Sequence, residues 1–222
     1  WILGLNGTNP TTGGASGVND MDIDSDGNLY FVGEYYDYCS NCSEPIITWA
    51  GTSVYSYQQQ GNTVGYVAKV LENGTEGWIQ AISEENDDFR IDAVAVREGQ
   101  DGSFQNLVIA GSRHGGTHGW GRIRNVVMDE NCYYSDSNVV WGYTMNLDEN
   151  GECVGTLSSG WGGLGMTFFE MISGHGTRFL SFTDLDYDQG SIIVIGAFNG
   201  ELRGRSSYQG STYFTIQSSS DG

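Results

Sequence analysis

Three aspartates at alternate positions form the part of the chain whose residue types most suggest a metal site. Asp22, Asp24 and Asp26 are followed by Gly27, and carboxylates at positions 1, 3 and 5 of a loop can converge on one calcium ion. The second half of such a loop is missing, because Gly33 stands where a bidentate glutamate would complete it. We favour a hairpin turn over this segment and keep calcium as the alternative. No other cofactor is expected.

Paired carboxylates beside aromatic residues suggest a second chemistry, the binding or hydrolysis of sugars. The acids available for it near a tyrosine-rich insertion and in the following segment are Glu34, Asp37, Glu85, Asp87 and Asp88. With 28 acidic residues in the chain any pair can be chosen, so we assign no catalytic residue.

His114 and His118 stand four apart in a glycine-rich stretch that favours a loop over a helix. The chain also has no serine nucleophile elbow and no phosphate-binding loop, and we expect it not to be an enzyme.

Cysteines and glycosylation sequons point to an extracellular or cell-surface location. The four cysteines are Cys39, Cys42, Cys132 and Cys153, and the three sequons begin at Asn6, Asn41 and Asn73. We expect two local disulfides, 39–42 and 132–153, although four cysteines allow three pairings. A lone C-x-x-C could also serve redox or zinc chemistry, but no second one completes a zinc ribbon. The three asparagines are candidate N-glycosylation sites.

The overall charge excludes one class of partner. Nine basic and 28 acidic residues give a formal net charge of −19, which repels the phosphate backbone that nucleic-acid-binding proteins must neutralise. No apolar run approaches the ~18 residues of a membrane-spanning helix. Glycine is frequent, at 34 of 222 residues, but proline is rare, and aromatic residues make up 13%. This composition is typical of a packed globular domain rather than a disordered chain.

The strands and turns that would position these residues come from a sequence repeat that occurs three times. Each copy reads as a strand, a turn and an apolar strand ending at Gly33, Gly111 or Gly196. A third strand follows in each copy and runs into a polar turn; these strands are 66–70, 141–147 and 213–216. Asn-Gly and Asp-Gly at the turns predict two-residue hairpin loops.

Fourth strands are expected at 78–82 and 153–157, whereas the last repeat stops at its turn. Trp1–Leu5 matches 78–82 and could supply the missing strand. The segment 166–172 could be a short helix or a buried strand. The predicted fold is therefore all-β, with three four-stranded antiparallel repeats at about 6–82, 83–157 and 158–222, in one domain or part of one that spans 1–222.

These repeats resemble the bacterial and archaeal cell-surface β-propeller repeat family. The match is closest in the first repeat, at Ile23-Asp-Ser-Asp-Gly-Asn-Leu-Tyr-Phe-Val-Gly33, with Gly65-Tyr-Val-Ala-Lys-Val70, Asn73-Gly74 and Trp78. The second and third repeats keep the skeleton of strands and glycines. The resemblance implies propeller blades, in which the N-terminal strand completes the last blade.

Three blades are fewer than a closed propeller needs. The chain could be a fragment of a longer propeller, half of a six-bladed ring, or a subunit that joins others head to tail. In the last case the first strand of one subunit would pair with the open edge of the next. The residues of this assembly contact would be Trp1, Ile2, Leu3, Leu5, Tyr213, Phe214 and Ile216.

We therefore expect an extracellular structural or adhesive module of the propeller type. Such a module could serve as the subunit of a surface assembly or filament. Its partners would be further copies, other surface proteins or glycans, and not nucleic acid or a membrane span. Two alternatives stay open: a secreted carbohydrate-binding or carbohydrate-active protein on a propeller scaffold, and a calcium-dependent adhesion module.

Overall fold

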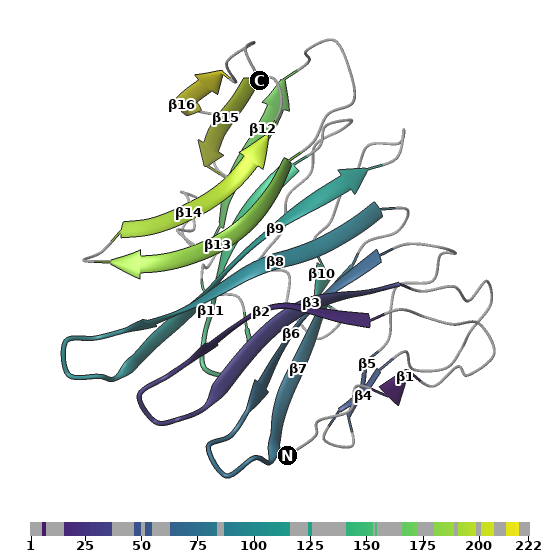
Figure 1. Ribbon diagram of the computed structural model, residues 1–222, viewed down its shortest axis with the longest axis vertical. Coiled ribbons are helices and arrows are strands. Elements are labelled where there is room, and N and C mark those ends of the chain that lie inside the picture. Colours follow the sequence, from purple (N-terminus) through teal and green to yellow (C-terminus); the bar gives the residue numbers. More distant parts are fainter. Residues whose placement is uncertain are drawn as a thin grey trace.

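The structure is a computed structural model in which the fold is all-β. It describes residues 6–7, 16–36, 47–49, 52–54, 63–83, 87–115, 124–125, 141–152, 154, 166–172, 180–188, 191–198, 201–206 and 212–217. These residues form antiparallel strands and the turns between them, with no helix (Figure 1). Within this described part, accordingly, no helix is long and apolar enough to cross a membrane.

The strands belong to four sheets, none of which closes on itself. The first sheet has the order β10-β7-β6-β3-β2, and its strands are β2 (Ser16–Ile23), β3 (Leu29–Tyr36), β6 (Thr63–Val70), β7 (Glu76–Ser83) and β10 (Arg124–Asn125). The second has the order β16-β15-β12-β11-β9-β8, with β8 (Asp87–Glu98), β9 (Phe104–Gly115), β11 (Trp141–Leu147), β12 (Met166–Ile172), β15 (Glu201–Ser206) and β16 (Thr212–Gln217). A hairpin of β13 (Leu180–Asp188) and β14 (Ser191–Phe198) is the third, and β1 (Asn6–Gly7), β4 (Ile47–Trp49) and β5 (Thr52–Val54) form a small fourth sheet.

The first predicted repeat is confirmed as four consecutive antiparallel strands. β2 pairs with β3, β3 with β6, and β6 with β7. Alternating apolar residues favour this arrangement, because successive side chains of a strand point to opposite faces of the sheet. Each face of this sheet contributes to a separate hydrophobic cluster.

The second repeat has its first three strands as predicted, but β12 and not the expected fourth strand pairs with most of β11. β8, β9 and β11 are adjacent, and β12 pairs with β11 from Trp141 to Met145. The fourth strand expected at 153–157 therefore cannot lie along that part of β11. Val154 does donate a backbone hydrogen bond to Asn146 O at 2.9 Å, at the other end of the strand. The segment 166–172 is a strand and not a helix.

The third repeat departs further from the prediction. Its first two strands form the expected hairpin, β13 with β14. The strand expected to extend that hairpin, β16, instead pairs with β15. The intervening strand β15 is near β16 in sequence, so a local hairpin closes a short loop at low entropic cost, and β12 then joins this hairpin to the second sheet. A third four-stranded sheet is thus not seen among the described residues.

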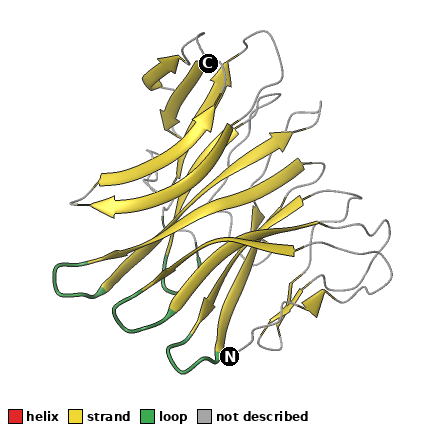
Figure 2. Cartoon of the chain, viewed as in Figure 1, coloured by secondary structure: helices red, strands yellow, loops and turns green. Residues whose placement is uncertain are grey.

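Four turns lie at one end of the molecule (Figure 2) and share one conformation. Each is a four-residue turn whose last residue is a glycine with φ between 77° and 83°. These glycines are Gly27, Gly74, Gly102 and Gly151. At the first, Gly27 N donates to Asp24 O, and Asp24 N donates to Asn28 O. The two-residue loops predicted at Gly74 and Gly151 are therefore wrong, because these loops have three residues. The turn predicted at Gly222 lies outside the described residues. A right-handed turn followed by a left-handed glycine restores the twist that the two strands need.

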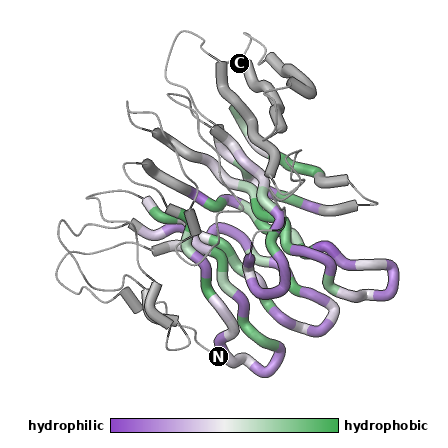
Figure 3. The backbone as a smooth tube through the Cα atoms, turned by 180° about the vertical axis from the view of Figure 1, so that it is seen from behind, coloured by the Kyte–Doolittle hydropathy of each residue, from purple (hydrophilic) through white to green (hydrophobic). Residues whose placement is uncertain are grey.

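The core lies where one sheet packs on the next, with β8 between β2 and β13 (Figure 1). One buried cluster joins the first and second sheets and includes Tyr30, Val32, Ile91 and Val94. Another joins the second sheet to the β13–β14 hairpin and includes Val108, Ala110, Phe182 and Leu185. Figure 3 shows hydrophobic segments where the sheets meet and hydrophilic residues at the tips of the hairpins.

Candidate functional site

The candidate site is the line of edge strands β2, β8 and β13, along which polar side chains of one sheet reach the backbone of the next. β2 and β8 are both edge strands of their sheets. An edge strand carries backbone N–H and C=O groups without ladder partners, which can pair with another chain unless something covers them. Along β8 and β13, side chains from the preceding sheet perform that task.

Two carboxylates of β2 bridge the first boundary. Asp20 Oδ2 accepts a hydrogen bond from Val94 N at 2.9 Å, and Asp22 Oδ2 accepts one from Val96 N at 2.7 Å. The other oxygen of each carboxylate accepts from the next residue of its own strand, at 2.8 Å in both cases. A hydrogen bond to an ionised acceptor is about twice as strong as a neutral one. The aspartates therefore fix β2 against β8 without a ladder between the strands.

A bulge residue reaches across each boundary. The ladder of β2 shifts register at Asn19, and that of β8 shifts at Asp92. Asn19 Nδ2 donates to Ile91 O at 2.9 Å, and Asp92 Oδ2 accepts from Phe182 N at 3.4 Å. Ile91 and Phe182 occupy the same register position, opposite Gly111 and Gly196. The same type of contact thus joins the first sheet to the second and the second to the third.

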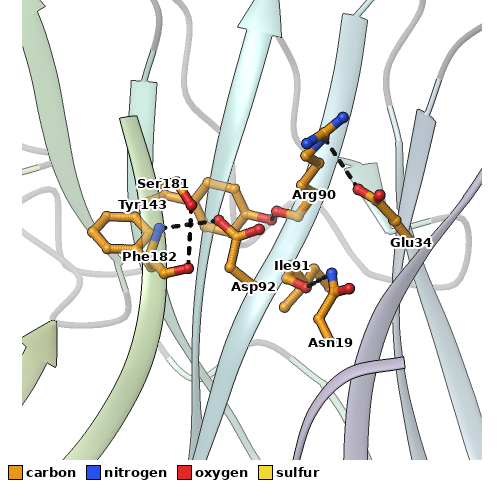
Figure 4. A network of polar contacts seen from close by, with 8 residues as sticks. All are labelled: Asn19, Glu34, Arg90, Ile91, Asp92, Tyr143, Ser181 and Phe182. Atoms are coloured by element: carbon orange, nitrogen blue, oxygen red, sulfur yellow. Dashed lines mark hydrogen bonds and ion pairs between the residues drawn. The ribbon is translucent and has the colours of Figure 1, made fainter. Parts of the chain in front are cut away.

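Figure 4 shows how the polar groups around Asp92 are arranged. Burial raises the pKa of the Asp92 carboxyl, and its bond from Phe182 N and the charge of Arg90 act against that rise. Arg90 Nε pairs with Glu34 Oε2 at 3.1 Å, in an ion pair between β8 and β3. A half-exposed pair of this kind contributes little stability on its own, but it links the first and second sheets at a third point.

Near the bulges of β2 and β8, a tyrosine on the third strand of the repeat donates a hydrogen bond from its hydroxyl to a backbone carbonyl. Tyr66 Oη donates to Gly17 O at 2.8 Å, and Tyr143 Oη donates to Arg90 O at 3.0 Å. Burial raises the pKa of both phenols, that of Tyr66 to about 12, so each keeps the proton that it donates. A Cβ atom on Gly33 would overlap Gly17 O, and one on Gly111 would overlap Arg90 O. The glycines that end the predicted strands are therefore required by close contact.

The three aspartates proposed for calcium have separate partners. The Asp22 carboxylate binds backbone N–H groups, as described above. Asp24 is buried and accepts from Asn28 N at 2.7 Å, from Asn28 Nδ2, and from Tyr30 Oη at 3.0 Å. Asp26 is exposed in the turn. Among the described residues no three histidine, cysteine or acidic side chains form a group that could hold a metal ion. The calcium site remains a prediction.

Several other predicted site residues lie outside the described residues. They are Cys39, Cys42, Cys132, Cys153, Asn41, Asp37, Glu85, His118 and the strand Trp1, Ile2, Leu3 and Leu5. Asn6 lies in β1 and Asn73 lies exposed in the turn after β6, where its Oδ1 accepts from Thr75 N at 2.9 Å. Asp87 and Asp88 begin β8, and His114 lies in β9 rather than in the expected loop.

The expected assembly strand near the end of the chain is described in its backbone. Tyr213, Phe214 and Ile216 belong to β16, which is the last strand of the second sheet in the described order. Its ladder partner is β15, with Ile216 opposite Leu202. Among the described strands only β15 pairs with β16, so the other side of β16 is compatible with the addition of a strand, which stays a prediction.

Sequence reasoning missed Asn19, Asp20 and Asp92, although a signal for Asp20 was present. Asp20 and Asp22 alternate along a strand and so share one face, but the search for a calcium loop grouped Asp22 with Asp24 and Asp26 instead. A bulge such as that at Asp92 leaves no signature of its own in the sequence. Comparison of the chain with protein-family models, curated proteins and solved structures gives no match.

Proposed function

We propose that the chain is an extracellular structural or adhesive module of the β-propeller type, built from blade-like repeats. The observation that carries the proposal is the use of polar side chains along the edge strands. Asp20, Asp22 and Asp92 each bind backbone N–H groups of the next sheet. Glu34, one of the acids considered for sugar hydrolysis, pairs with Arg90. These contacts are those of a scaffold in which each sheet positions the next.

Two further features support the propeller type. The first repeat contributes four consecutive antiparallel strands to its sheet, as a blade has, and the first strands of successive repeats are neighbours, β2 beside β8 and β8 beside β13. The bulge, glycine and tyrosine recur at matching positions in the first two repeats. The extracellular location rests on the sequence, through its cysteines and sequons, of which Asn73 lies in an exposed turn. We also propose that copies join by addition of the Trp1–Leu5 strand to the free side of β16.

A glycan panel tests this function against its carbohydrate-active alternative. The purified chain is incubated with neutral, acidic and sulfated oligosaccharides, and the products are followed by chromatography and mass spectrometry. A structural or adhesive module leaves every oligosaccharide uncleaved. Hydrolysis that is lost in a Glu34→Gln variant, but retained in a Glu98→Gln variant of another partly exposed acid, would overturn the proposal.

A further inference from the structure

The register of the three hairpins assigns equivalent positions to their first strands. Opposite the glycines stand Val18, Ile91 and Phe182. After the bulge, Met21, Val94 and Leu185 are equivalent in the same way. This correspondence allows the environment of one position to be compared across the sheets.

Equivalent residues of the first strands are buried in two sheets and exposed in one. Ile91 and Val94 lie in the cluster between the first and second sheets, and Phe182 and Leu185 lie in the next cluster. Val18 and Met21 are 55% and 64% exposed, and no sheet of the described residues precedes β2. Ile23, further along β2, is 60% exposed. β2 therefore exposes to solvent the equivalents of the residues by which β8 and β13 pack against the sheet before them.

The second strands of the hairpins show the opposite pattern. On the side that faces the following sheet, their residues are buried in the first two hairpins and exposed in the last. Tyr30 and Val32 of β3 are buried between the first and second sheets. Their equivalents in β9, Val108 and Ala110, are buried between the second and third. By the same register, the equivalents in β14 are Ile193 and Ile195, which are 45% and 53% exposed. Within the described part of the chain, the outer face of β13–β14 is thus not covered by a following sheet, whereas the corresponding faces of the first and second sheets are.

The aspartates of β13 occupy the same register positions as those of β2. Asp184 and Asp186 of β13 are the equivalents of Asp20 and Asp22. Asp184 Oδ1 accepts from Leu185 N at 2.9 Å, as Asp20 Oδ1 accepts from Met21 N at 2.8 Å. In Asp20 the second oxygen binds the next sheet. Asp184 is exposed and already held in the orientation from which that bond is made.

We infer that β2 of a second copy of this chain docks on the outer face of β13–β14. The contact repeats the one that β8 makes with the first sheet: Met21 and Ile23 of the second copy pack on Ile193 and Ile195, as Val94 and Val96 pack with Tyr30 and Val32. Asp184 would face the edge of the docked β2, where the Met21 N–H already donates to Asp20 Oδ1. The rest of the first sheet's outer face, including Tyr66 and Val64, is already buried, so the docking surface is β2 itself. A heterologous contact of this kind gives a ring or a filament, according to the rotation between copies.

The inference rests on the proposed structural role and names the surface that joins the copies. It is distinct from strand addition, which would use β16. Both docking faces carry aspartates, and each copy has a net charge of −19. Salt at about 0.5 M screens such repulsion over more than a few ångströms, so self-association is expected to strengthen with salt.

Two face variants test the inference by sedimentation velocity of the full chain at about 0.5 M salt. Met21→Asp removes the β2 face and Ile195→Asp removes the β14 face, and each is expected to weaken self-association at least about tenfold, because a carboxylate would be buried without a partner. Leu71→Asp, at an exposed apolar residue in a turn away from both faces, is the matched control and should associate as the native chain does. Circular dichroism establishes that all three variants fold.

Mixing the two face variants gives the decisive result. Each variant keeps one working face, so fluorescently distinguished Met21→Asp and Ile195→Asp chains are expected to form mixed one-to-one pairs through this contact, which neither variant can make alone. A native chain that stays monomeric, face variants that associate like the native chain, or a mixture without mixed dimers would each overturn the inference. The glycan panel is independent of association, so failure here is distinguishable from failure of the proposed function.

Discussion

Asp22 Oδ2 accepts a hydrogen bond from the backbone N–H of Val96 at 2.7 Å, across the boundary between two sheets that share no ladder at that point. Asp20 makes the same contact with Val94 two residues earlier. The two carboxylates protect the exposed edge of β8 and fix the position of one sheet on the next. A repeat protein needs such a contact at each boundary, because each unit is stabilised by its neighbours.

Replacing either carboxylate should destabilise the fold. Asp20→Ala and Asp22→Ala leave a partly buried N–H group without its acceptor, so each is expected to lower the free energy of unfolding by about 1–3 kcal/mol. Urea denaturation measures the loss. Asp26→Ala, in the exposed turn of the same hairpin, is the control and should change stability by less than about 0.5 kcal/mol. Equal stability of all three variants would contradict a bridging role.

The close contact at Gly111 predicts a large effect of one methyl group. Gly111→Ala would place a Cβ atom on Arg90 O and 2.7 Å from Tyr143 Oη, and the resulting overlap is expected to cost about 1–3 kcal/mol or more. Gly17→Ala is the matched control, because its Cβ atom would meet no atom within 4 Å. Thermal unfolding of both variants measures the difference. A Gly111→Ala chain as stable as Gly17→Ala would show that the bulge can move away.

Buried phenols predict loss of stability in alkali. Burial raises the pKa of Tyr66 from 10.0 to about 12, so the folded state holds a proton that the unfolded state releases. The stabilisation from this group is complete below pH 10 and is lost as the pH rises to about 12, at about 1.4 kcal/mol per pH unit. Denaturation at several pH values should show a smaller decline in Tyr66→Phe than in the native chain, while Tyr30 and Tyr143 contribute equally to both. Parallel declines would contradict the burial of an un-ionised Tyr66.

The local part of this fold could be predicted from the sequence, and the pairing of distant strands could not. Alternating apolar residues and the glycines at 33, 111 and 196 identified the three hairpins, since strand period and turn residues are local signals. The place of β12 beside β11 and the pairing of β16 with β15 depend on competition between strands far apart in sequence. Of the candidate site, the sequence singles out Asp22 by its spacing, but spacing alone does not reveal that its carboxylate accepts a hydrogen bond from the backbone of another sheet.

Removal of Trp1–Leu5 tests strand addition at β16. An added strand contributes a row of main-chain hydrogen bonds, so the shortened chain is expected to associate at least about tenfold more weakly. Sedimentation velocity measures this beside the native chain. Native association in the shortened chain would contradict strand addition and leave the contact between β2 and β13–β14 as the one that joins copies.

Chelation tests calcium at Asp22, Asp24 and Asp26. The oxygens of Asp22 and Asp24 accept hydrogen bonds from protein groups, so EDTA is expected to leave the melting temperature within about 1 °C. A ligand that binds the folded state at 100 times its dissociation constant stabilises it by about 2.7 kcal/mol, which would shift the melting temperature measurably. A fall in EDTA that added calcium reverses would favour the calcium-dependent adhesion module instead.

Electron microscopy of the native chain tests the central claim most directly, namely that sheets stacked in series end in two complementary faces that bind further copies. The account predicts rings or filaments that become more abundant with concentration and with salt, and that disappear in the Ile195→Asp variant. Isolated particles of single-chain size under every condition would contradict it.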